Sequence, residues 1–233
     1  MVVGVLLLRF FNVKTDRRKP TLKESNMPEN QQHGFLWESI VRSLVFGLDG
    51  KDKYTAVHDI PCCRNTLNPN ENVSIKTTGN STLCMGDALR VFEYEADVEH
   101  TCIAIQYAQR GEEKVLTHVY EIDLTQREVL WGSVTREDIE ELDQLVRSMP
   151  ANRRDPVIDR AITQKKNDLN AKSGAIRFNP KIDSKTQRRL QCSIPLFANY
   201  PALIKSTTTE PIVRGVPIVA SITGGRRVRN RRV

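Results

Sequence analysis

Apolar residues recur along the chain with two different periods, and these periods separate predicted helices from predicted strands. In residues 33–48 the spacing of Phe35, Ile40, Leu44 and Val45 predicts a helix, which Gly47 would end. Short β-branched and aromatic runs, separated by turn residues, predict strands at 54–60, 73–77, 88–94, 101–107 and 115–124.

The second half of the chain begins with two predicted helices. Thr135, with Asp138 three residues later, forms a capping-box pattern before an apolar helical run. Pro156 suits a first helical turn, and this second helix is predicted to run to about Ala171. Strand-like segments follow at 175–178 and 190–196, and the last segment predicts one or two more. This order predicts an α/β (α+β) fold with a central mixed, mostly antiparallel sheet flanked by helices.

Composition is typical of a globular chain. The 233 residues are 39% hydrophobic and 27% charged, which is enough for one compact core without disulfide or metal support. Residues 1–32 are polar after an apolar start and predict a flexible lead-in. We expect a single domain at 33–222, and a basic tail at 223–233 that holds five arginines.

Charge divides the chain into two unequal parts. Residues 1–150 carry 17 Lys and Arg against 23 Asp and Glu, while residues 151–233 carry 18 against 5. The net charges are therefore −6 and +13, which together give the overall +7. A basic rear half favours a polyanionic partner, most simply nucleic acid, although a solvated basic tail is the alternative.

Several protein classes do not fit the sequence. No apolar run approaches the length of about 20 residues that a membrane helix needs. The apolar start lacks the basic region and cleavage site of a secretory signal. The five cysteines are odd in number and show no C-x-x-C spacing, which argues against a disulfide framework or a zinc knuckle. We therefore expect an intracellular protein, cytoplasmic or nuclear, that is neither secreted nor bound to a membrane.

Three residues could carry metal-dependent chemistry on phosphodiesters. Glu38 lies in the first predicted helix, Asp59 near the end of the predicted strand 54–60, and Lys76 inside the predicted strand 73–77. Carboxylates can hold Mg²⁺, which polarises a phosphate and activates water, while a lysine can orient that water. Ser74 and Lys76 share one face of their strand. The alternative for Lys76 is an edge-strand lysine that faces solvent or pairs with a carboxylate.

These segments resemble a known family. The acid in GFLWE, the Asp in HDIP, and the strand SIK followed by TTG are similar to the PD-(D/E)XK nucleases, in particular the type II restriction endonuclease-like branch. The resemblance covers roughly residues 33–125. It implies that Glu38 and Asp59 bind Mg²⁺, that Lys76 positions the nucleophilic water, and that the fold is restriction endonuclease-like.

This chain departs from the family pattern at two places. The order around proline is inverted, with Asp59-Ile60-Pro61 in place of Pro-Asp, and the larger departure is at position 74. Ser74 stands where the family usually has Glu or Asp, so one metal ligand is missing unless Glu38, Glu71 or Asp87 replaces it. We name Asp59, Glu38 and Glu71 as the predicted metal ligands, because relocation of this carboxylate recurs in the superfamily.

Other candidate sites are weaker. Glu112-Glu113-Lys114 is a literal E-x-K motif, but its polar context after Arg110-Gly111 predicts a hairpin turn. The segment REDIEELDQ carries five carboxylates at a spacing that predicts a solvated helix face. His58 precedes Asp59 directly, and in a strand the two side chains would point to opposite faces.

A polar and basic segment at 177–191 predicts contact with DNA. Its Arg and Lys side chains can neutralise phosphates, while Arg and Gln can also read base edges. The predicted DNA-binding residues are Arg177, Lys181, Lys185, Gln187, Arg188, Arg189 and Gln191. A solvent-exposed loop between strands is the alternative.

The sequence thus leads to three hypotheses. The first is a Mg²⁺-dependent endonuclease of restriction type that hydrolyses duplex DNA, as a homodimer if its site is palindromic. The second is a nucleic-acid-binding protein on the same fold that has lost catalysis, as Ser74 would allow. The third is a structural or assembly protein whose basic tail contacts nucleic acid or an acidic partner.

Overall fold

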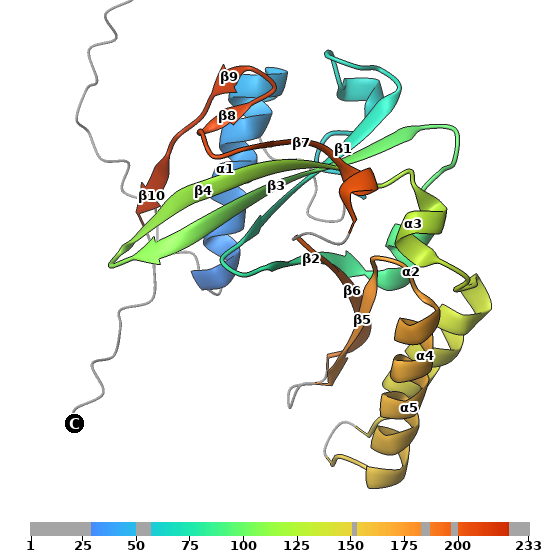
Figure 1. The fold of residues 1–233 in the computed structure, drawn as a ribbon. Helices are drawn as coiled ribbons and strands as arrows, with labels where there is room; N and C mark the ends of the chain where they lie inside the picture. The colour runs from blue at the N-terminus through green and yellow to red at the C-terminus, as the bar shows by residue number, and fades with distance from the viewer. Residues whose placement is uncertain (1–28, 50–56, 151–152, 183–186, 197–199, 224–233) are drawn as a thin grey trace, which may run out of the picture.

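The computed structural model describes residues 29–49, 57–150, 153–182, 187–196 and 200–223, with the backbone alone for 29–34 (Figure 1). The predicted lead-in and basic tail therefore lie almost wholly outside the described residues. The architecture is mixed α and β, with a curled, mostly antiparallel main sheet and a few helices. No helix within the described ranges is long and apolar enough to cross a membrane.

The first helix, α1 (Glu29–Phe46), confirms the helix predicted from residue 33 and starts four residues earlier. It ends where Gly47 adopts φ +64°, a conformation that favours glycine. The buried face is rotated relative to the prediction. Leu44 is 54% exposed, while Trp37, Val41 and Phe46 are buried.

In the described residues the main sheet has the strand order β1-β3-β4-β10. A further strand, β7, also pairs with β4 and belongs to the same sheet. Its strands are β1 (Glu71–Thr78), β3 (Glu99–Arg110), β4 (Glu113–Asp123), β7 (Ile204–Thr208) and β10 (Ser221–Thr223). β1 runs parallel to β3, and the other pairs are antiparallel. The strands predicted at 73–77, 101–107 and 115–124 are confirmed, and so is the hairpin turn at Gly111.

Two smaller sheets complete the strands. One has the order β2-β6-β5, formed by β2 (Thr82–Asp87), β5 (Arg177–Ile182) and β6 (Arg188–Pro195). The other pairs β8 (Ile212–Val213) with β9 (Val216–Pro217). The strands predicted at 175–178 and 190–196 are confirmed as β5 and β6, but they lie in the β2-β6-β5 sheet rather than in one central sheet, whereas β7 and β10 of the last segment join the main sheet.

The later helices are α2 (Ala88–Phe92), α3 (Arg127–Trp131), α4 (Arg136–Ser148) and α5 (Pro156–Lys172), with 3-10 turns at Cys62–Arg64 and Pro201–Leu203. The capping box of Thr135 and Asp138 is confirmed, and Asp155 caps α5 before Pro156. Figure 1 shows α4 and α5 side by side, next to β5 and β6, in a lobe below the main sheet.

Two predicted strands are wrong. Of the segment 54–60, residues 57–59 form a bend and Ile60 makes an isolated bridge to Val73, while 54–56 lie outside the described residues. The segment 88–94 holds helix α2, because the side chain of Asp87 caps it by accepting from the backbone N–H of Arg90. A short apolar run does not by itself distinguish a strand from a buried helix.

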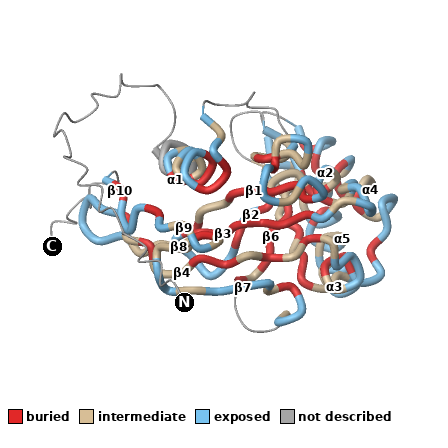
Figure 2. The backbone as a smooth tube through the Cα atoms, turned by 90° about the horizontal axis from the view of Figure 1, so that it is seen from above, coloured by how far each residue is buried: buried red, intermediate tan, exposed pale blue. Residues whose placement is uncertain are grey.

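The main sheet separates two cores, visible as buried stretches along its strands in Figure 2. On one face, alternate residues such as Ile75 and Ile103 pack against α1. On the other, Cys102 and Ala104 join the core beneath α2, α4 and α5. The prediction of a fully solvated acidic face on α4 is wrong in part. Asp143 is buried there, where it accepts from the N–H of Leu190 at 3.2 Å and pairs with Arg147.

Candidate functional site

The structure brings Asp59 and Lys76 together at the edge of the main sheet. Lys76 lies in β1, the outermost strand, and its Nζ is 3.1 Å from Oδ2 of Asp59. The two side chains remain 31% and 20% exposed. The contact agrees with the alternative for Lys76 given above, in which the lysine pairs with a carboxylate. It also brings together two residues of the predicted site.

Asp59 is held by the free edge of β1. Ile60 exchanges two backbone hydrogen bonds with Val73, at 2.9 and 2.8 Å. Asp59 continues this pairing with its side chain, because its Oδ2 accepts from the N–H of Ile75 at 2.5 Å. The carboxylate therefore substitutes for a neighbouring strand at this position, which fixes one oxygen. The hydrogen bonds and ion pairs found among the described residues leave Oδ1 available.

Helix α1 reaches the same place from the other side. The guanidinium of Arg42 donates to the backbone carbonyl of Asp59. Glu38 lies one helical turn before Arg42, on the same side of α1, and is half-buried. Glu38, the predicted helical acid, therefore lies near Arg42, which contacts Asp59. Among the interactions resolved for the described residues, none joins Glu38 directly to Asp59 or Lys76.

The side of Lys76 away from α1 carries a cluster of rings. The ring of Tyr94 stacks on His100 at 4.6 Å, and His58 lies 4.8 Å from Tyr94 and 5.1 Å from His100. Ser74, which shares the strand face of Lys76, hydrogen-bonds the side chain of Tyr94. His58 therefore shares the site with Asp59. The prediction that the side chains of His58 and Asp59 point to opposite faces is wrong. The chain bends at residues 57–59, so the alternation of a strand does not apply there.

Electrostatics keep Lys76 charged and the neighbouring rings neutral. Burial opposes the charge of Lys76, but the carboxylate of Asp59 outweighs it and raises the pKa of the lysine above its usual value. Burial, assisted by His100, lowers the pKa of His58 to about 4. Burial also raises the pKa of Tyr94. At neutral pH the site holds a lysine cation, a neutral imidazole and a protonated phenol.

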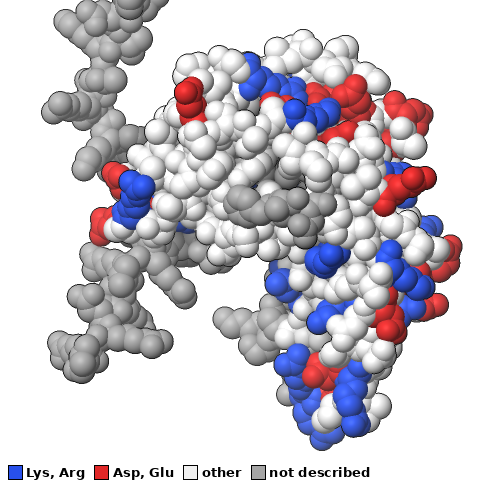
Figure 3. Space-filling model, viewed as in Figure 1, with Lys and Arg blue, Asp and Glu red and all other residues white. Residues whose placement is uncertain are grey.

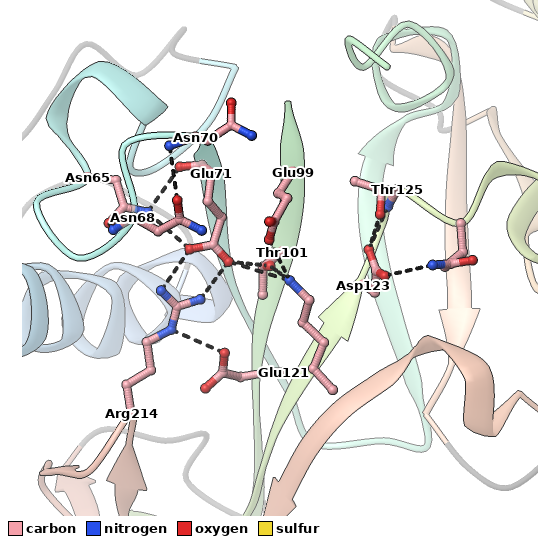
Figure 4. A network of polar contacts seen from close by, with 12 residues as sticks. Asn65, Asn68, Asn70, Glu71, Glu99, Thr101, Glu121, Asp123, Thr125 and Arg214 are labelled. Atoms are coloured by element: carbon pink, nitrogen blue, oxygen red, sulfur yellow. Dashed lines mark hydrogen bonds and ion pairs between the residues drawn. The ribbon is translucent and has the colours of Figure 1, made fainter. Parts of the chain in front are cut away.

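Glu71, the third predicted metal ligand, lies elsewhere (Figure 4). It is on the α1 face of the sheet, opposite to Lys76, and Arg214 binds both of its oxygens at 2.8 and 2.7 Å. Thr101 and Asn65 donate to the same carboxylate at 2.5 and 3.1 Å. Burial would raise the pKa of Glu71, but these hydrogen bonds and the charge of Arg214 lower it to about 2. All of its acceptor capacity is used within the protein.

Asp87 also serves a structural purpose, as the N-cap of α2. Among the described residues, no group of three His, Cys, Asp or Glu side chains is arranged to hold a metal ion. Mg²⁺ typically binds one or two carboxylates and keeps several waters or substrate oxygens. A single aspartate with an available oxygen is compatible with this mode. Glu38 lies on the same side of α1 as Arg42, which contacts Asp59.

The predicted DNA-binding residues fall into two groups. Arg177 donates to the carbonyls of Gly174 and Ile176, and Arg188 donates to those of Met149 and Pro150, so both brace the fold. The others that the structure describes share the outward face of the β5–β6 hairpin or its exposed start: Lys181, Gln187, Arg189 and Gln191. Lys185 lies outside the described residues.

Basic side chains gather on one part of the molecule. Figure 3 shows Lys and Arg concentrated over the lobe of α4, α5, β5 and β6, while the front of the main sheet is largely uncharged. Some of these cations are paired within the lobe, as Lys165 is with Asp138 and Glu141. The hairpin residues Lys181 and Arg189 face each other in register on adjacent strands.

Sequence reasoning missed several residues of this region. Arg42 and Tyr94 reach the site only through tertiary packing, and no local sequence pattern predicts either contact. Lys114 is a further surprise, because it is buried and its ammonium lies 4.7 Å from the ring centre of Tyr107. The E-x-K motif at 112–114 nevertheless sits at the predicted hairpin.

Comparisons of this chain with models of known families, with curated proteins and with solved structures find no match.

Proposed function

We propose that the protein is a Mg²⁺-dependent endonuclease that hydrolyses phosphodiester bonds of duplex DNA, on a restriction endonuclease-like fold. The observation that carries the proposal is the pairing of Asp59 with Lys76 at 3.1 Å on an open strand edge. Glu38, Asp59 and Lys76 follow one another along the chain in the order of the nuclease motif that the sequence resembles.

The residues of the chain would divide the work as follows. Asp59 uses one oxygen to anchor itself to β1 and leaves the other for a metal ion, with Glu38 as the second acid. Bound Mg²⁺ would polarise the phosphate and lower the pKa of a water molecule. Lys76 keeps its charge at neutral pH, so it can orient that water and stabilise the negative charge that develops on the phosphate.

The β5–β6 hairpin would supply DNA contacts. Lys181 and Arg189 lie on its outward face with Gln191, which combines two cations with an amide that can read adenine. A two-stranded ribbon fits the major groove of B-DNA. A homodimer is part of the proposal only for a palindromic site, because two-fold DNA symmetry matches a two-fold protein dimer.

One observation favours a second candidate, a DNA-binding protein without catalysis. Ser74 occupies the position of the usual second acid, and Glu71 and Asp87 are both engaged in structural contacts. Incubation of purified protein with plasmid DNA and Mg²⁺ or Mn²⁺ separates the two. Nicking that is lost in Lys76→Ala supports the endonuclease, and salt-dependent binding without nicking supports the second candidate.

A further inference from the structure

We propose that Asn179 and Gln191 together read an adenine in the major groove and so determine part of the DNA sequence that the protein recognises. This inference rests on the DNA binding in the proposed function. It deepens that function, because it names the base that the β5–β6 hairpin reads and adds Asn179 to the residues that read it.

The outward face of the hairpin carries three rows of paired side chains. Phe178 of β5 and Leu190 and Cys192 of β6 belong to the core beneath α2, α4 and α5, so the residues that alternate with them point away from it. Figure 1 shows β5 and β6 side by side, with α4 and α5 on one side of them. The strand register gives the three rows: Arg177 with Ser193, Asn179 with Gln191, and Lys181 with Arg189.

The three rows differ in what remains open to a ligand. In the first row Arg177 donates to backbone carbonyls and Ser193 is buried. In the last row Lys181 and Arg189 are exposed, and no hydrogen bond or ion pair joins either to a residue that the structure describes. The middle row lies between them and consists of two half-buried amides. Exposed cations suit phosphates, whereas amides held in place suit a base edge.

The side-chain amide of Asn179 has one fixed orientation. Its Nδ2 donates to Oγ of Ser193 at 2.7 Å and to the backbone carbonyl of Arg177 at 3.1 Å. A backbone carbonyl only accepts, so the nitrogen must lie on this side, and both of its N–H groups are used. No donor among the described residues reaches Oδ1 of Asn179, which leaves this oxygen as an acceptor for a ligand.

Gln191 offers the complementary group. It lies directly opposite Asn179, and opposed side chains of this kind have Cβ atoms about 4.5–5.5 Å apart. Its Oε1 lies 3.8 Å from Sγ of Cys84 on β2, and no residue that the structure describes binds its Nε2. Asp87 opposes Gln191 on β2 and caps α2. A carboxylate at this place disfavours a phosphate beside the amides, which favours a base instead.

One acceptor beside one donor matches a single base edge. In the major groove adenine presents a donor at N6 and an acceptor at N7, and amide side chains make this pairing in protein–DNA complexes. Oδ1 of Asn179 can accept from N6 while Nε2 of Gln191 donates to N7. Guanine presents two acceptors and would leave Oδ1 unpaired. A G·C pair that uses O6 of guanine and N4 of cytosine is the competing interpretation, and the test separates the two.

The test selects duplexes from a random-sequence DNA library in EDTA, which removes Mg²⁺, and measures their affinity by fluorescence anisotropy. We expect the selected sequences to share an A·T pair. Replacing its adenine by 7-deazaadenine, which lacks the N7 acceptor, should weaken binding by the wild type about tenfold and binding by Gln191→Ala not at all. Purine, which lacks the N6 donor, should give the same contrast between the wild type and Asn179→Ala. Both variants should keep the salt dependence of binding, because they remove neutral groups.

Asn167→Ala is the matched control, since Asn167 is an exposed amide on α5. Lys181→Gln should reduce the slope of log K against log salt by about 0.9, the value for one phosphate contact, without changing the selected sequence. Thermal unfolding checks that each variant is folded. If Asn179→Ala does not fold, Gln191→Ala decides alone, because it removes only a weak contact to Cys84.

Three results would overturn the inference: selection of G·C pairs alone, binding without sequence preference, or an A·T preference that survives the substitutions. An equal loss in Asn167→Ala would do the same. Cleavage assays with Mg²⁺ separate this inference from the proposed function. Cleavage that depends on Lys76 but shows no A·T preference refutes the reading of adenine alone. An A·T preference that depends on Asn179 and Gln191, without cleavage, refutes the endonuclease alone.

Discussion

Two ion pairs involve residues of β1, and they differ in exposure and in the number of hydrogen bonds that the carboxylate accepts. Glu71 and Arg214 have side chains that are 3% and 17% exposed, and the carboxylate receives hydrogen bonds on both oxygens. Asp59 and Lys76 are 20% and 31% exposed, meet through one oxygen, and sit on an open strand edge. The first pair is saturated by the protein. The second pair retains a carboxylate oxygen and an ammonium hydrogen that can bind a ligand.

This difference separates a structural role from a functional one. Both acids were candidate metal ligands on sequence grounds, because position along a strand gives no information about partners. A buried carboxylate is stable only if its hydrogen bonds and charge are compensated, and Glu71 meets that condition fully. An aspartate that keeps an available oxygen beside a charged lysine is suited to bind a ligand.

The largest expected effect comes from breaking the open pair. Lys76→Ala or Asp59→Asn should reduce the rate of DNA cleavage about a thousandfold, since each removes a group that acts on the reacting phosphate or its metal. Cleavage of a supercoiled plasmid measures the rate. Lys172→Ala, which breaks an ion pair between α5 and Asp138 of α4, is the matched control and should cleave normally. Full activity in Lys76→Ala would contradict the site.

Breaking the saturated pair should instead affect stability. Glu71→Gln removes the buried charge that Arg214 binds through two hydrogen bonds and leaves Glu121 to compensate the guanidinium, and we expect a loss of about 2 kcal/mol in the free energy of unfolding. Chemical denaturation measures this loss. Glu99→Gln serves as the control, because Glu99 is half exposed and its one ion pair among the described residues is with Lys205. Equal effects of the two substitutions would show that the Glu71 network has no special weight.

The same network predicts a dependence of stability on pH. The pKa of Glu71 is lowered from 4.5 to about 2, because hydrogen bonds and the charge of Arg214 overcome the effect of burial. A lowered carboxyl pKa stabilises the folded state at pH values above 4.5, and this contribution is lost as the pH falls towards 2. Unfolding free energies measured across that range should decline less steeply in Glu71→Gln than in wild type. Parallel declines would disprove the assignment.

The smallest effect is expected at the rim of the network. Lys205 contacts Glu99 at 3.2 Å and Glu71 at 3.7 Å, but its side chain is one-third exposed. Lys205→Met should cost only about 0.5 kcal/mol, as solvent-exposed pairs do. A loss near that of Glu71→Gln would mean that the ammonium, and not Arg214 alone, compensates the buried carboxylate.

Local patterns were sufficient for the long periodic elements. The helices at α1, α4 and α5 and the strands β1, β3 and β4 follow from apolar spacing and capping residues. The short segment 88–94 was misread because its apolar composition suits a helix as well as a strand, and the cap at Asp87 decides the outcome. The bend at 57–59 likewise has no local signal, because the alternating pattern of the segment continues through it.

The site depended more strongly on contacts that are distant in sequence. Asp59 and Lys76 were assigned to one site from the sequence, and they meet in the structure because Ile60 bridges to Val73. The engagement of Glu71 by Arg214 and of Arg188 by Met149 and Pro150 was not foreseen, because composition does not reveal which cations are used internally.

The turn that presents Arg214 has a consequence for how the chain is made. Arg214 adopts φ +48° in the tight β8–β9 hairpin and binds a glutamate 143 positions earlier, while its guanidinium lies 5.4 Å from the ring centre of Phe46. A ribosome must therefore synthesise most of the polypeptide before the first strand obtains its counter-charge. Nascent chains that stop short of this hairpin lack the guanidinium that binds both oxygens of Glu71, and we expect them to be recognised and degraded as incomplete.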